Sequence, residues 1–396
     1  MAQHQRSGTM QAGLAVLAAA LMASFWTAGA SAETPASALE LAKEYAMPPE
    51  LMAEWEAEHK VPMGWIAGAR TEGGIRFSGA SRPEDFERMV VPFRERYPFV
   101  KVEYTRGNRN ARVVKLLAAF REGRYITDIV AGINTRLHLF RKLDALTDLS
   151  DLPTRANIPL KLGAAATFWV GTGLRYYCLA YSPRLVKKSE LPISWDDLKT
   201  NKALAGHKLA DWYGVGSWLL PLWGKKGRDW TTRFVKGIFE TVQAERRNEG
   251  MTALTSLAGT GEFNAVLAVA AGTVIALQKK GAPVGFHCPD TVMVNAPVAG
   301  LLNGSPNTCS GKLLLNWLLS MEGQLFQYHY TGARPIHRAL QNEKFVPFPK
   351  ETLGKTLAFH DPGELGDDLP RLMKIWSPYW ESGGGPKGEG GARKSR

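Results

Sequence analysis

Side chains that could bind a charged or polar molecule fall into two sets in this sequence. Arg82, Arg112 and Arg175 favour an anion such as a phosphonate, a phosphate ester or a carboxylate. Asp211 and Trp212, in the stretch DWYG, favour an amine or a zwitterion, because a carboxylate beside an aromatic ring suits a cationic group. A zwitterionic or phosphorylated organic molecule would satisfy both sets, and the sequence leaves this choice open.

Most of these side chains lie where a predicted strand ends or a predicted helix begins. Unpaired backbone N–H groups at such places attract anions, so neighbouring hydroxyls, amides and glycines are candidates as well. The candidate ligand-binding residues are Ser78, Ser81, Arg82, Asn110, Arg112, Gly132, Trp169, Arg175, Tyr177, Asp211, Trp212, Ala271, Gly272 and Arg334. Structural roles stay open for several of them: Ser81 as a helix cap, Arg112 and Arg334 as surface charges, and Trp169 as a core residue.

The sequence lacks the motifs of several known catalytic sites. It contains no G-x-S-x-G nucleophile elbow and no H-E-x-x-H, and GVGSW (214–218) lacks the final glycine. It also contains no C-x-x-C and no H-x-x-x-H pair that would indicate a structural zinc site. We therefore expect neither catalysis nor a cofactor. A secreted hydrolase whose residues meet only in space stays open as an alternative.

The two ends of the chain resemble segments that lie outside a folded core. Residues 13–26 are apolar and Ala30-Ser31-Ala32 fits the pattern cut by signal peptidase, so residues 1–32 predict a secretory signal; an uncleaved membrane anchor is the alternative. Residues 33–65 predict an N-terminal helical extension that packs on the outside. Residues 381–396 predict a disordered, basic, Gly-rich tail.

Charge and cysteine content narrow the range of partners. The formal net charge is +12, which suits an anionic small ligand or an anionic membrane surface. Nucleic acid is not expected, because export removes that partner and no basic stripe interleaved with aromatic residues occurs. In an oxidising compartment Cys288 and Cys309 could form a disulfide, with Cys178 as a buried thiol in an apolar run.

Strands alternate with helices from Gly74 onward, which predicts an α/β fold with a parallel sheet covered by helices. Predicted strands cover residues 74–79, 100–104, 127–132, 168–182, 207–211, 263–269, 282–288 and 292–302. Predicted helices include one that begins with a capping box at Ser81 and ends near Tyr97, and others at 110–122, 270–280 and 309–321.

The run GEFNAVLAVAAGTVI (261–275) offers few groups that could bind or react, and it is too short to span a bilayer. We interpret it as a buried strand that turns at residues 270–272 into a helix. Small residues and backbone N–H groups around Ala271 and Gly272 would then form the wall of a pocket.

Seven segments, in this order, resemble the extracellular solute-binding proteins of bacterial ABC importers, in the branch that includes the periplasmic ferric-iron binders. They are WIAGARTEGGIRFSG, FRERYPFVKVEYTRGN, EGRYITDIVAG, LAYSPRLVKKSELPISWDDL, GTGEFNAV, KKGAPVGF and LLNWLLSMEGQ. The resemblance implies the type II periplasmic-binding-protein fold, with two α/β lobes joined by two crossing strands and a ligand cleft between them. Lobe 1 would contain residues 66–168 and 296–345, and lobe 2 residues 169–295 and 346–380.

The same resemblance implies a periplasmic monomer that captures a small polar or anionic organic solute by hinge closure. Its partner would be an ABC permease in the inner membrane, or alternatively a membrane sensor. Ferric members of the family use two adjacent tyrosines after a Gly-Glu strand start, often with a histidine after the first strand.

Those ligand positions lack the chemistry that iron needs. Gly261-Glu262 is present, but the next thirteen residues contain no Tyr, His, Asp, Glu or Cys, and Ser81 stands where the histidine is expected. Tyr176 and Tyr177 are adjacent but should point to opposite faces of a strand, one into the core and one onto the cleft wall. A protein that binds ferric iron or an iron chelate is therefore the alternative, and no metal site is predicted.

Overall fold

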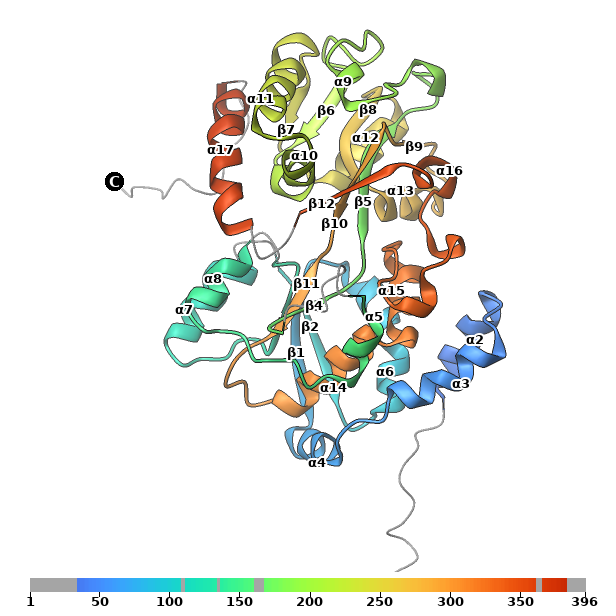
Figure 1. The fold of residues 1–396 in the computed structure, drawn as a ribbon, viewed down its shortest axis with the longest axis vertical. Helices are drawn as coiled ribbons and strands as arrows, with labels where there is room; N and C mark the ends of the chain where they lie inside the picture. The colour runs from blue at the N-terminus through green and yellow to red at the C-terminus, as the bar shows by residue number, and fades with distance from the viewer. Residues whose placement is uncertain (1–33, 108–110, 134–135, 160–166, 361–364, 383–396) are drawn as a thin grey trace, which may run out of the picture.

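The computed structural model describes residues 34–107, 111–133, 136–159, 167–360 and 365–382. The predicted secretory signal, the chain after residue 382 and the candidate Asn110 lie outside these residues. The described chain forms two α/β lobes stacked one above the other (Figure 1). The predicted fold class is therefore confirmed.

Lobe 1 is built around a sheet with the order β2-β1-β3-β11-β4. Its strands are β1 (Gly74–Gly79), β2 (Lys101–Arg106), β3 (Ile129–Ala131), β4 (Val170–Gly171) and β11 (Val298–Leu301). Strand β1 pairs in parallel with β2 and β3, while β11 runs antiparallel to β3 and β4. The carboxyl ends of β1, β2 and β3 therefore share one edge, which is where ligands bind in open α/β sheets.

Lobe 2 is built around a sheet with the order β12-β10-β5-β8-β6-β7, and β9 pairs with β5. Its strands are β5 (Arg175–Tyr181), β6 (Leu209–Trp212), β7 (Glu245–Arg247), β8 (Ala265–Ala270), β9 (Gly285–His287), β10 (Thr291–Asn295) and β12 (Thr356–Phe359). Every residue of β8 is buried, as its apolar sequence AVLAVA predicts for a strand covered on both faces.

The chain crosses between the lobes at two neighbouring places, and it crosses a third time after β11, on the way to β12. It leaves the first sheet after β4 and enters the second at β5, and it returns between β10 and β11. Gly173, with φ of +109°, lies in the first crossing, and Pro297 lies in the second. These residues divide each of the two long predicted strands, 168–182 and 292–302, into two shorter ones.

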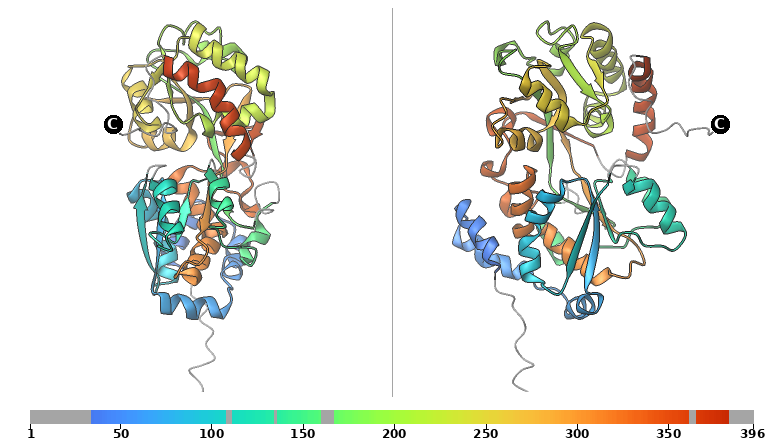
Figure 2. Two further views of the ribbon diagram at one scale, coloured as in Figure 1. Left: turned by 90° about the vertical axis from the view of Figure 1, so that its left-hand side faces the viewer. Right: turned by 180° about the vertical axis from the view of Figure 1, so that it is seen from behind.

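Helices cover both sheets (Figure 2). Those of lobe 1 are α4 (Met63–Glu72), α5 (Pro83–Met89), α6 (Val91–Arg96), the π-helix η1 (Ala111–Lys115), α7 (Leu116–Arg121), α8 (Leu137–Lys142), α14 (Thr308–Leu319) and α15 (Met321–Thr331). Those of lobe 2 are α9 (Trp195–Leu198), α10 (Leu219–Lys226), α11 (Arg228–Lys236), α12 (Met251–Thr260), α13 (Ala271–Gln278), α16 (Pro349–Thr352) and α17 (Leu365–Ser382).

The capping box predicted at Ser81 is wrong. The N-cap of α5 is Arg82, and its side chain does not cap the helix. The helix predicted to end near Tyr97 is interrupted at Val90. The next helix, α6, begins at Val91 with Pro92 in its first turn, where proline is well suited.

The N-terminal extension contains helices α2 (Ala36–Glu44) and α3 (Pro49–Glu58), which lie on the outside of lobe 1 in Figure 1. Its contact surface nevertheless contains buried charges. Glu56 pairs with Arg96 of α6, and Arg96 also pairs with Glu322 at the start of α15. Glu58 accepts a hydrogen bond from the Met321 backbone N–H at 2.7 Å. The extension is therefore joined to the two helices α6 and α15.

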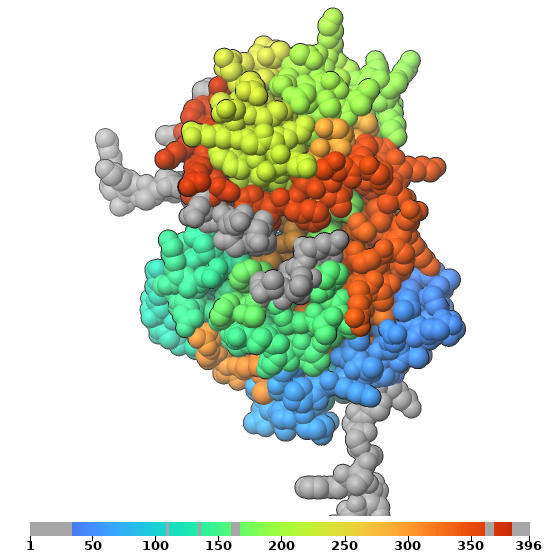
Figure 3. All heavy atoms as spheres, viewed as in Figure 1, coloured from blue at the N-terminus to red at the C-terminus, as the bar shows by residue number. Residues whose placement is uncertain are grey.

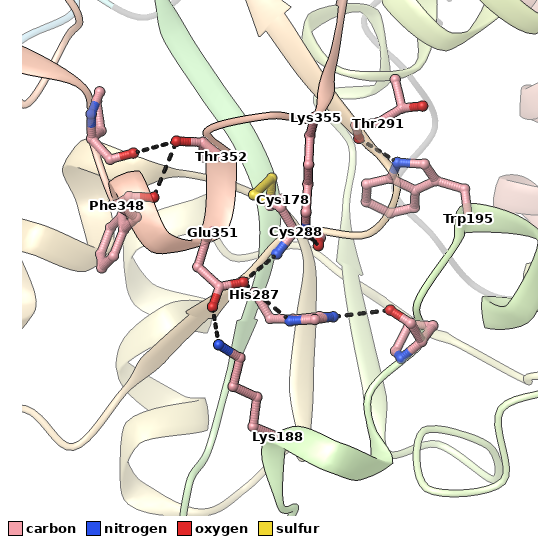
Figure 4. The surroundings of a disulfide bond; sticks show 12 residues. Cys178, Lys188, Trp195, His287, Cys288, Thr291, Phe348, Glu351, Thr352 and Lys355 are labelled. Carbon is pink, nitrogen blue, oxygen red and sulfur yellow. Dashed lines mark hydrogen bonds and ion pairs between the residues drawn. A yellow bond between two sulfur atoms is a disulfide. The ribbon is translucent and has the colours of Figure 1, made fainter. Parts of the chain in front are cut away.

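The disulfide predicted between Cys288 and Cys309 is also wrong, because the bond joins Cys178 to Cys288 (Figure 4). Cys178 lies on β5, and β5 pairs with β9 at Leu179 and His287, the residues next to the two cysteines. Sheet pairing in lobe 2 thus brings these sulfurs together. Cys309 lies in α14 of lobe 1 as a free, half-buried thiol.

Candidate functional site

A cavity of about 220 Å³ lies between the lobes, near the crossings. Lobe 1 contributes the loop after β1, the end of β2 and the last turn of α15. Lobe 2 contributes the first turn of α12, one face of α13 and the start of β5. The lining residues are Ala80, Ser81, Arg82, Asp85, Arg106, Arg175, Met251, Thr252, Ala270, Gly272, Thr273, Ala276, Leu277, Lys280, Tyr330, Thr331 and Gly332.

The orange-to-red chain that follows α15 passes over the surface from lobe 1 to lobe 2 (Figure 3). A smaller hollow adjoins the cavity on the side of lobe 1. It shares Ala80, Ser81, Arg175 and Thr331 with the cavity, and it is also lined by Tyr104 and Gly132.

Backbone N–H groups are available along this cavity. The first turns of α12 and α13 both line it, and neither helix has a side-chain cap at its N-terminus. The N–H of Ala270, the residue before α13, donates to the Met251 sulfur over 3.2 Å. A thioether is a weak acceptor, so an anionic oxygen would be a stronger partner for this N–H. Both helix starts also favour negative charge through their dipoles.

The charged side chains that line the cavity are mostly basic. Arg106, Arg175 and Lys280 carry positive charge, and the guanidinium of Arg82 binds the carboxylate of Asp85 through two hydrogen bonds of 2.7 and 2.9 Å. This ion pair keeps the Arg82 side chain close to the start of α5. A ligand in this cavity would therefore face an excess of positive charge.

Tyr104, which lines the adjoining hollow, also lies close to several positive charges. Burial raises its pKa to about 12, and the positive charges of Arg112, Arg106 and Arg175 act in the opposite direction. Its hydroxyl donates a hydrogen bond of 2.9 Å to the Ser81 carbonyl. The hydroxyl of Tyr104 therefore holds the loop after β1.

The structure places only some of the predicted residues around the cavity. Ser81, Arg82, Arg175 and Gly272 line the cavity itself, and Gly132 lines the hollow beside it. Ala271 is buried next to Gly272. The turn into α13 therefore lies at the cavity, as predicted for a pocket wall. Beyond the turn, one face of α13 also lines the cavity.

Two predicted arginines bind other parts of the chain instead of lining the cavity. Arg112 is buried, and it donates to the carbonyl oxygens of Gly107, Ala131 and Gly132, which joins the ends of β2 and β3. Arg334 donates from Nη1 to the Tyr176 hydroxyl at 2.6 Å. These contacts occupy side chains that the sequence presented as candidate anion ligands.

The remaining candidates are core residues. Ser78, Trp169, Tyr177 and Asp211 are buried, and none of them lines the cavity or the hollow. Tyr176 is buried as well as Tyr177, so the expectation that one of the two tyrosines lies on the cleft wall is wrong. The reason is that β5 runs between β8 and β10 and is covered on both faces.

Trp212 supports β8, since its indole Nε1 lies 3.1 Å from the carbonyl oxygen of Leu267 and 3.3 Å from that of Ala268. Ala268 has φ of +55°, at an irregularity in the pairing of β8 with β5. The indole thus binds carbonyl groups that a bulged strand leaves free, just before α13 begins.

Sequence reasoning missed Arg106, Met251, Thr252, Lys280 and the segment Tyr330–Gly332. Arg106 is the last residue of β2, and Gly250 precedes α12 as its N-cap, so strand and helix ends could have indicated both places. The last turn of α15 had no such signal, because only tertiary packing brings it to the cleft.

Within the described residues, no group of three or more His, Cys, Asp or Glu side chains is placed to hold a metal ion. Among the same residues, none of the helices is long and apolar enough to cross a membrane.

Comparisons with solved structures show the same fold at low sequence identity. Iron-bound HitA from Pseudomonas aeruginosa is 16% identical, with a TM-score of 0.63, and the match covers 77% of this chain and 99% of that chain. AfuA from Actinobacillus pleuropneumoniae, a periplasmic binding protein with fructose-6-phosphate bound, is 17% identical, with a TM-score of 0.62 and coverages of 77% and 98%. An ABC transporter substrate-binding protein from Bradyrhizobium japonicum is 15% identical, with a TM-score of 0.63 and coverages of 78% and 99%.

A comparison with curated proteins finds no match. The sequence model described as "Bacterial extracellular solute-binding protein" matches residues 88–350, more than half of the chain, and confirms the resemblance seen in the seven segments. The chain therefore belongs to the bacterial extracellular solute-binding protein family.

Proposed function

We propose that the solute which this binding protein captures for an ABC importer is a small organic anion with an apolar part. The observation that carries the proposal is that Arg106, Arg175 and the uncapped first turns of α12 and α13 line one cavity. Arginine and helix N-termini together favour phosphate, phosphonate or carboxylate groups. Met251, Ala276, Leu277 and the Tyr330 ring offer contacts for the rest of the molecule.

The proposal includes a secretory signal over residues 1–32, release as a periplasmic monomer, and delivery of the solute to a membrane permease. The family match supports solute capture outside the cytoplasm. AfuA supports a phosphorylated solute on this fold, because its structure contains fructose-6-phosphate. At this sequence identity the likeness supports only a shared fold. The evidence for an anionic ligand from this chain itself is that Arg106 and Arg175 line the cavity.

A thermal-shift screen tests the ligand class. The purified protein is heated with sugar phosphates, phosphonates, di- and tricarboxylates, polyamines, ferric chloride and ferric citrate. A ligand at a hundred times its Kd stabilises the folded state by about 2.7 kcal/mol, which raises the melting temperature measurably. We expect the shift from one or more organic anions.

Arg175→Met should weaken that ligand at least about tenfold, because a charged hydrogen bond contributes roughly 1.5–3 kcal/mol. Arg184→Met is the matched control, since Arg184 is exposed and does not line the cavity. Shifts from polyamines alone, or from ferric chloride alone, would contradict the proposed ligand class. Equal affinity in Arg175→Met and in the parent protein would contradict the proposed position of the anion.

A further inference from the structure

Three glycines from three distant segments make close contacts where the lobes join. Gly272 lies in the first turn of α13, Gly332 ends α15, and Gly173 lies in the first crossing. A Cβ atom placed on Gly272 would lie 1.9 Å from the Thr331 carbonyl oxygen. A Cβ atom on Gly332 would lie 2.7 Å from the Gly272 Cα, and one on Gly173 would lie 3.1 Å from the Ala333 Cβ. The two lobes thus touch backbone to backbone at this junction.

Both sides of the contact are parts of well-packed elements. On the side of lobe 1, Met321, Leu325 and Phe326 fix α15 in the main core. On the side of lobe 2, α13 follows directly from the buried strand β8. Neither side of the contact is a loop that could move aside easily if a side chain were added there.

The segment after Gly332 is also fixed to the first crossing. Leu174 and Arg334 exchange two backbone hydrogen bonds of 2.8 Å, and the Arg334 guanidinium binds the Tyr176 hydroxyl. Residues 331–334 therefore lie between α13 of lobe 2 and the first crossing. The end of α15 therefore forms a non-covalent contact between the lobes beside the first crossing.

Gly272, Thr331 and Gly332 line the solute cavity as well as forming the contact. The contact therefore forms part of the cavity wall. A methyl group on Gly272 would require the Thr331 oxygen to retreat by ~1.5 Å, since ordinary contact begins near 3.4 Å.

We propose that the Gly272–Gly332 contact sets how closely the two lobes approach, which makes positions 272 and 332 determinants of the closed conformation and of cavity size. The inference rests on the two-lobe binding role and not on the identity of the solute. Its test accordingly needs no ligand.

The test measures the distance between the lobes by double electron–electron resonance in the full chain without added ligand. Spin labels are attached at Val114→Cys in lobe 1 and Ile193→Cys in lobe 2, both exposed positions, in a Cys309→Ser background. Gly272→Ala should move the distance distribution to longer values or broaden it in that direction.

Gly64→Ala is the matched control. Gly64 is also the second residue of its helix, α4, and a Cβ atom there meets nothing within 4 Å. The gain in helix propensity is therefore shared by both variants, while the steric conflict belongs only to Gly272→Ala. Identical distance distributions in Gly272→Ala and Gly64→Ala would overturn the proposal.

Gly332→Ala approaches the same contact from lobe 1 and serves if Gly272→Ala does not fold, as judged by circular dichroism. Gly332 has φ of +63°, so its control is Gly281→Ala, with φ of +81° and open space around the added methyl group. Gly332→Ala should lengthen the distance and Gly281→Ala should not. An equal response of these two would assign the effect to backbone strain and would overturn the proposal. A ligand of unexpected class in the thermal-shift screen would leave these outcomes unchanged.

Discussion

At the scale of single residues, Asp211 is a carboxylate that the fold buries without a full set of partners. It is fully buried at the end of β6, where its Oδ1 accepts a hydrogen bond of 2.8 Å from the Trp212 N–H. Among the described residues, its Oδ2 has no hydrogen-bond partner. Burial raises the pKa of Asp211 well above its usual value, while Arg246 on the neighbouring strand β7 acts in the opposite direction.

We therefore expect Asp211→Asn to stabilise the protein at pH 7.5 by roughly 1–3 kcal/mol, because the amide avoids the cost of ionising a buried carboxyl group. The raised pKa means that the parent protein loses stability as the pH rises from the unfolded-state pKa through the folded-state pKa. The amide keeps an oxygen for the Trp212 N–H and cannot ionise, so the advantage of the variant should shrink towards pH 4.

Urea denaturation at pH 4 and pH 7.5 measures this difference, with Asp229→Asn on the exposed side of α11 as the control. A loss of stability at pH 7.5 would show instead that Asp211 is ionised and held by Arg246.

The candidate residues also show what spacing along the chain can predict. The sequence located the loops after β1 and β3 and the start of α13, because strand and helix ends leave local signals. It did not predict that Arg112 binds backbone carbonyls or that Arg334 binds Tyr176, because these partners are far apart in the sequence or belong to the backbone. Side-chain direction depends on tertiary packing, so the loops were predictable and most of the side chains were not.

At the scale of elements, the N-terminal helices are attached to lobe 1 through Arg96, which also forms a buried ion pair with Glu322 inside lobe 1. The Arg96 side chain is 1% exposed and that of Glu322 is fully buried, and their atoms approach to 2.7 Å. Arg96 also binds Glu56 of α3 through two hydrogen bonds. Burial raises the pKa of Glu322, and the Arg96 guanidinium opposes that change.

Arg96→Met should destabilise the protein by roughly 3–5 kcal/mol, because it leaves the Glu322 carboxylate buried without its partner. Without Arg96 the pKa of Glu322 should rise further, so the loss should be larger at pH 8 than at pH 5. Thermal or urea unfolding of both proteins at the two pH values checks the expectation.

Arg124→Met provides the comparison, since Arg124 pairs with Glu122 at the surface, where an ion pair contributes about 0–1 kcal/mol. If the two substitutions cost the same, the buried network would not be what fastens the extension.

Most elements could be predicted from the sequence, and the failures have local causes. Apolar strands followed by amphipathic helices indicated β1, β2, β3, β6 and β8 at nearly their observed positions. The two crossings were predicted as long strands, because Gly173 and Pro297 interrupt an apolar pattern that otherwise continues. The buried role of α3 was not predicted, because Glu56 and Glu58 resemble surface residues until Arg96 and α15 are brought against them.

At the scale of the whole molecule, one core connects the two lobes. A single cluster of buried apolar residues includes Trp55 of the extension, Trp317 of lobe 1 and Val266 and Phe286 of lobe 2, with Tyr176 on the crossing strand β5. The lobes also touch where α17 of lobe 2 meets α8 of lobe 1, on the opposite side of the crossing strands from α13 and α15 (Figure 1). We expect the lobes to unfold together, because the core that stabilises each of them continues into the other.

The Cys178–Cys288 disulfide tests this expectation, because it lies within lobe 2 alone and closes a loop of 110 residues. From the entropy of loop closure, replacing both cysteines by alanine should cost about 4–5 kcal/mol. If the lobes are coupled, the double variant should lower the denaturation midpoint of both. Hydrogen exchange measured by mass spectrometry across a urea series follows β1 and α14 in lobe 1 and β6 and β8 in lobe 2. We expect protection in all four segments to be lost at one lowered midpoint.

Cys309→Ala, which removes a thiol outside the disulfide, is the control and should leave the midpoint of the parent protein nearly unchanged. A variant in which β6 and β8 exchange early while β1 and α14 keep the parent midpoint would show that the crossings separate two independent folding units.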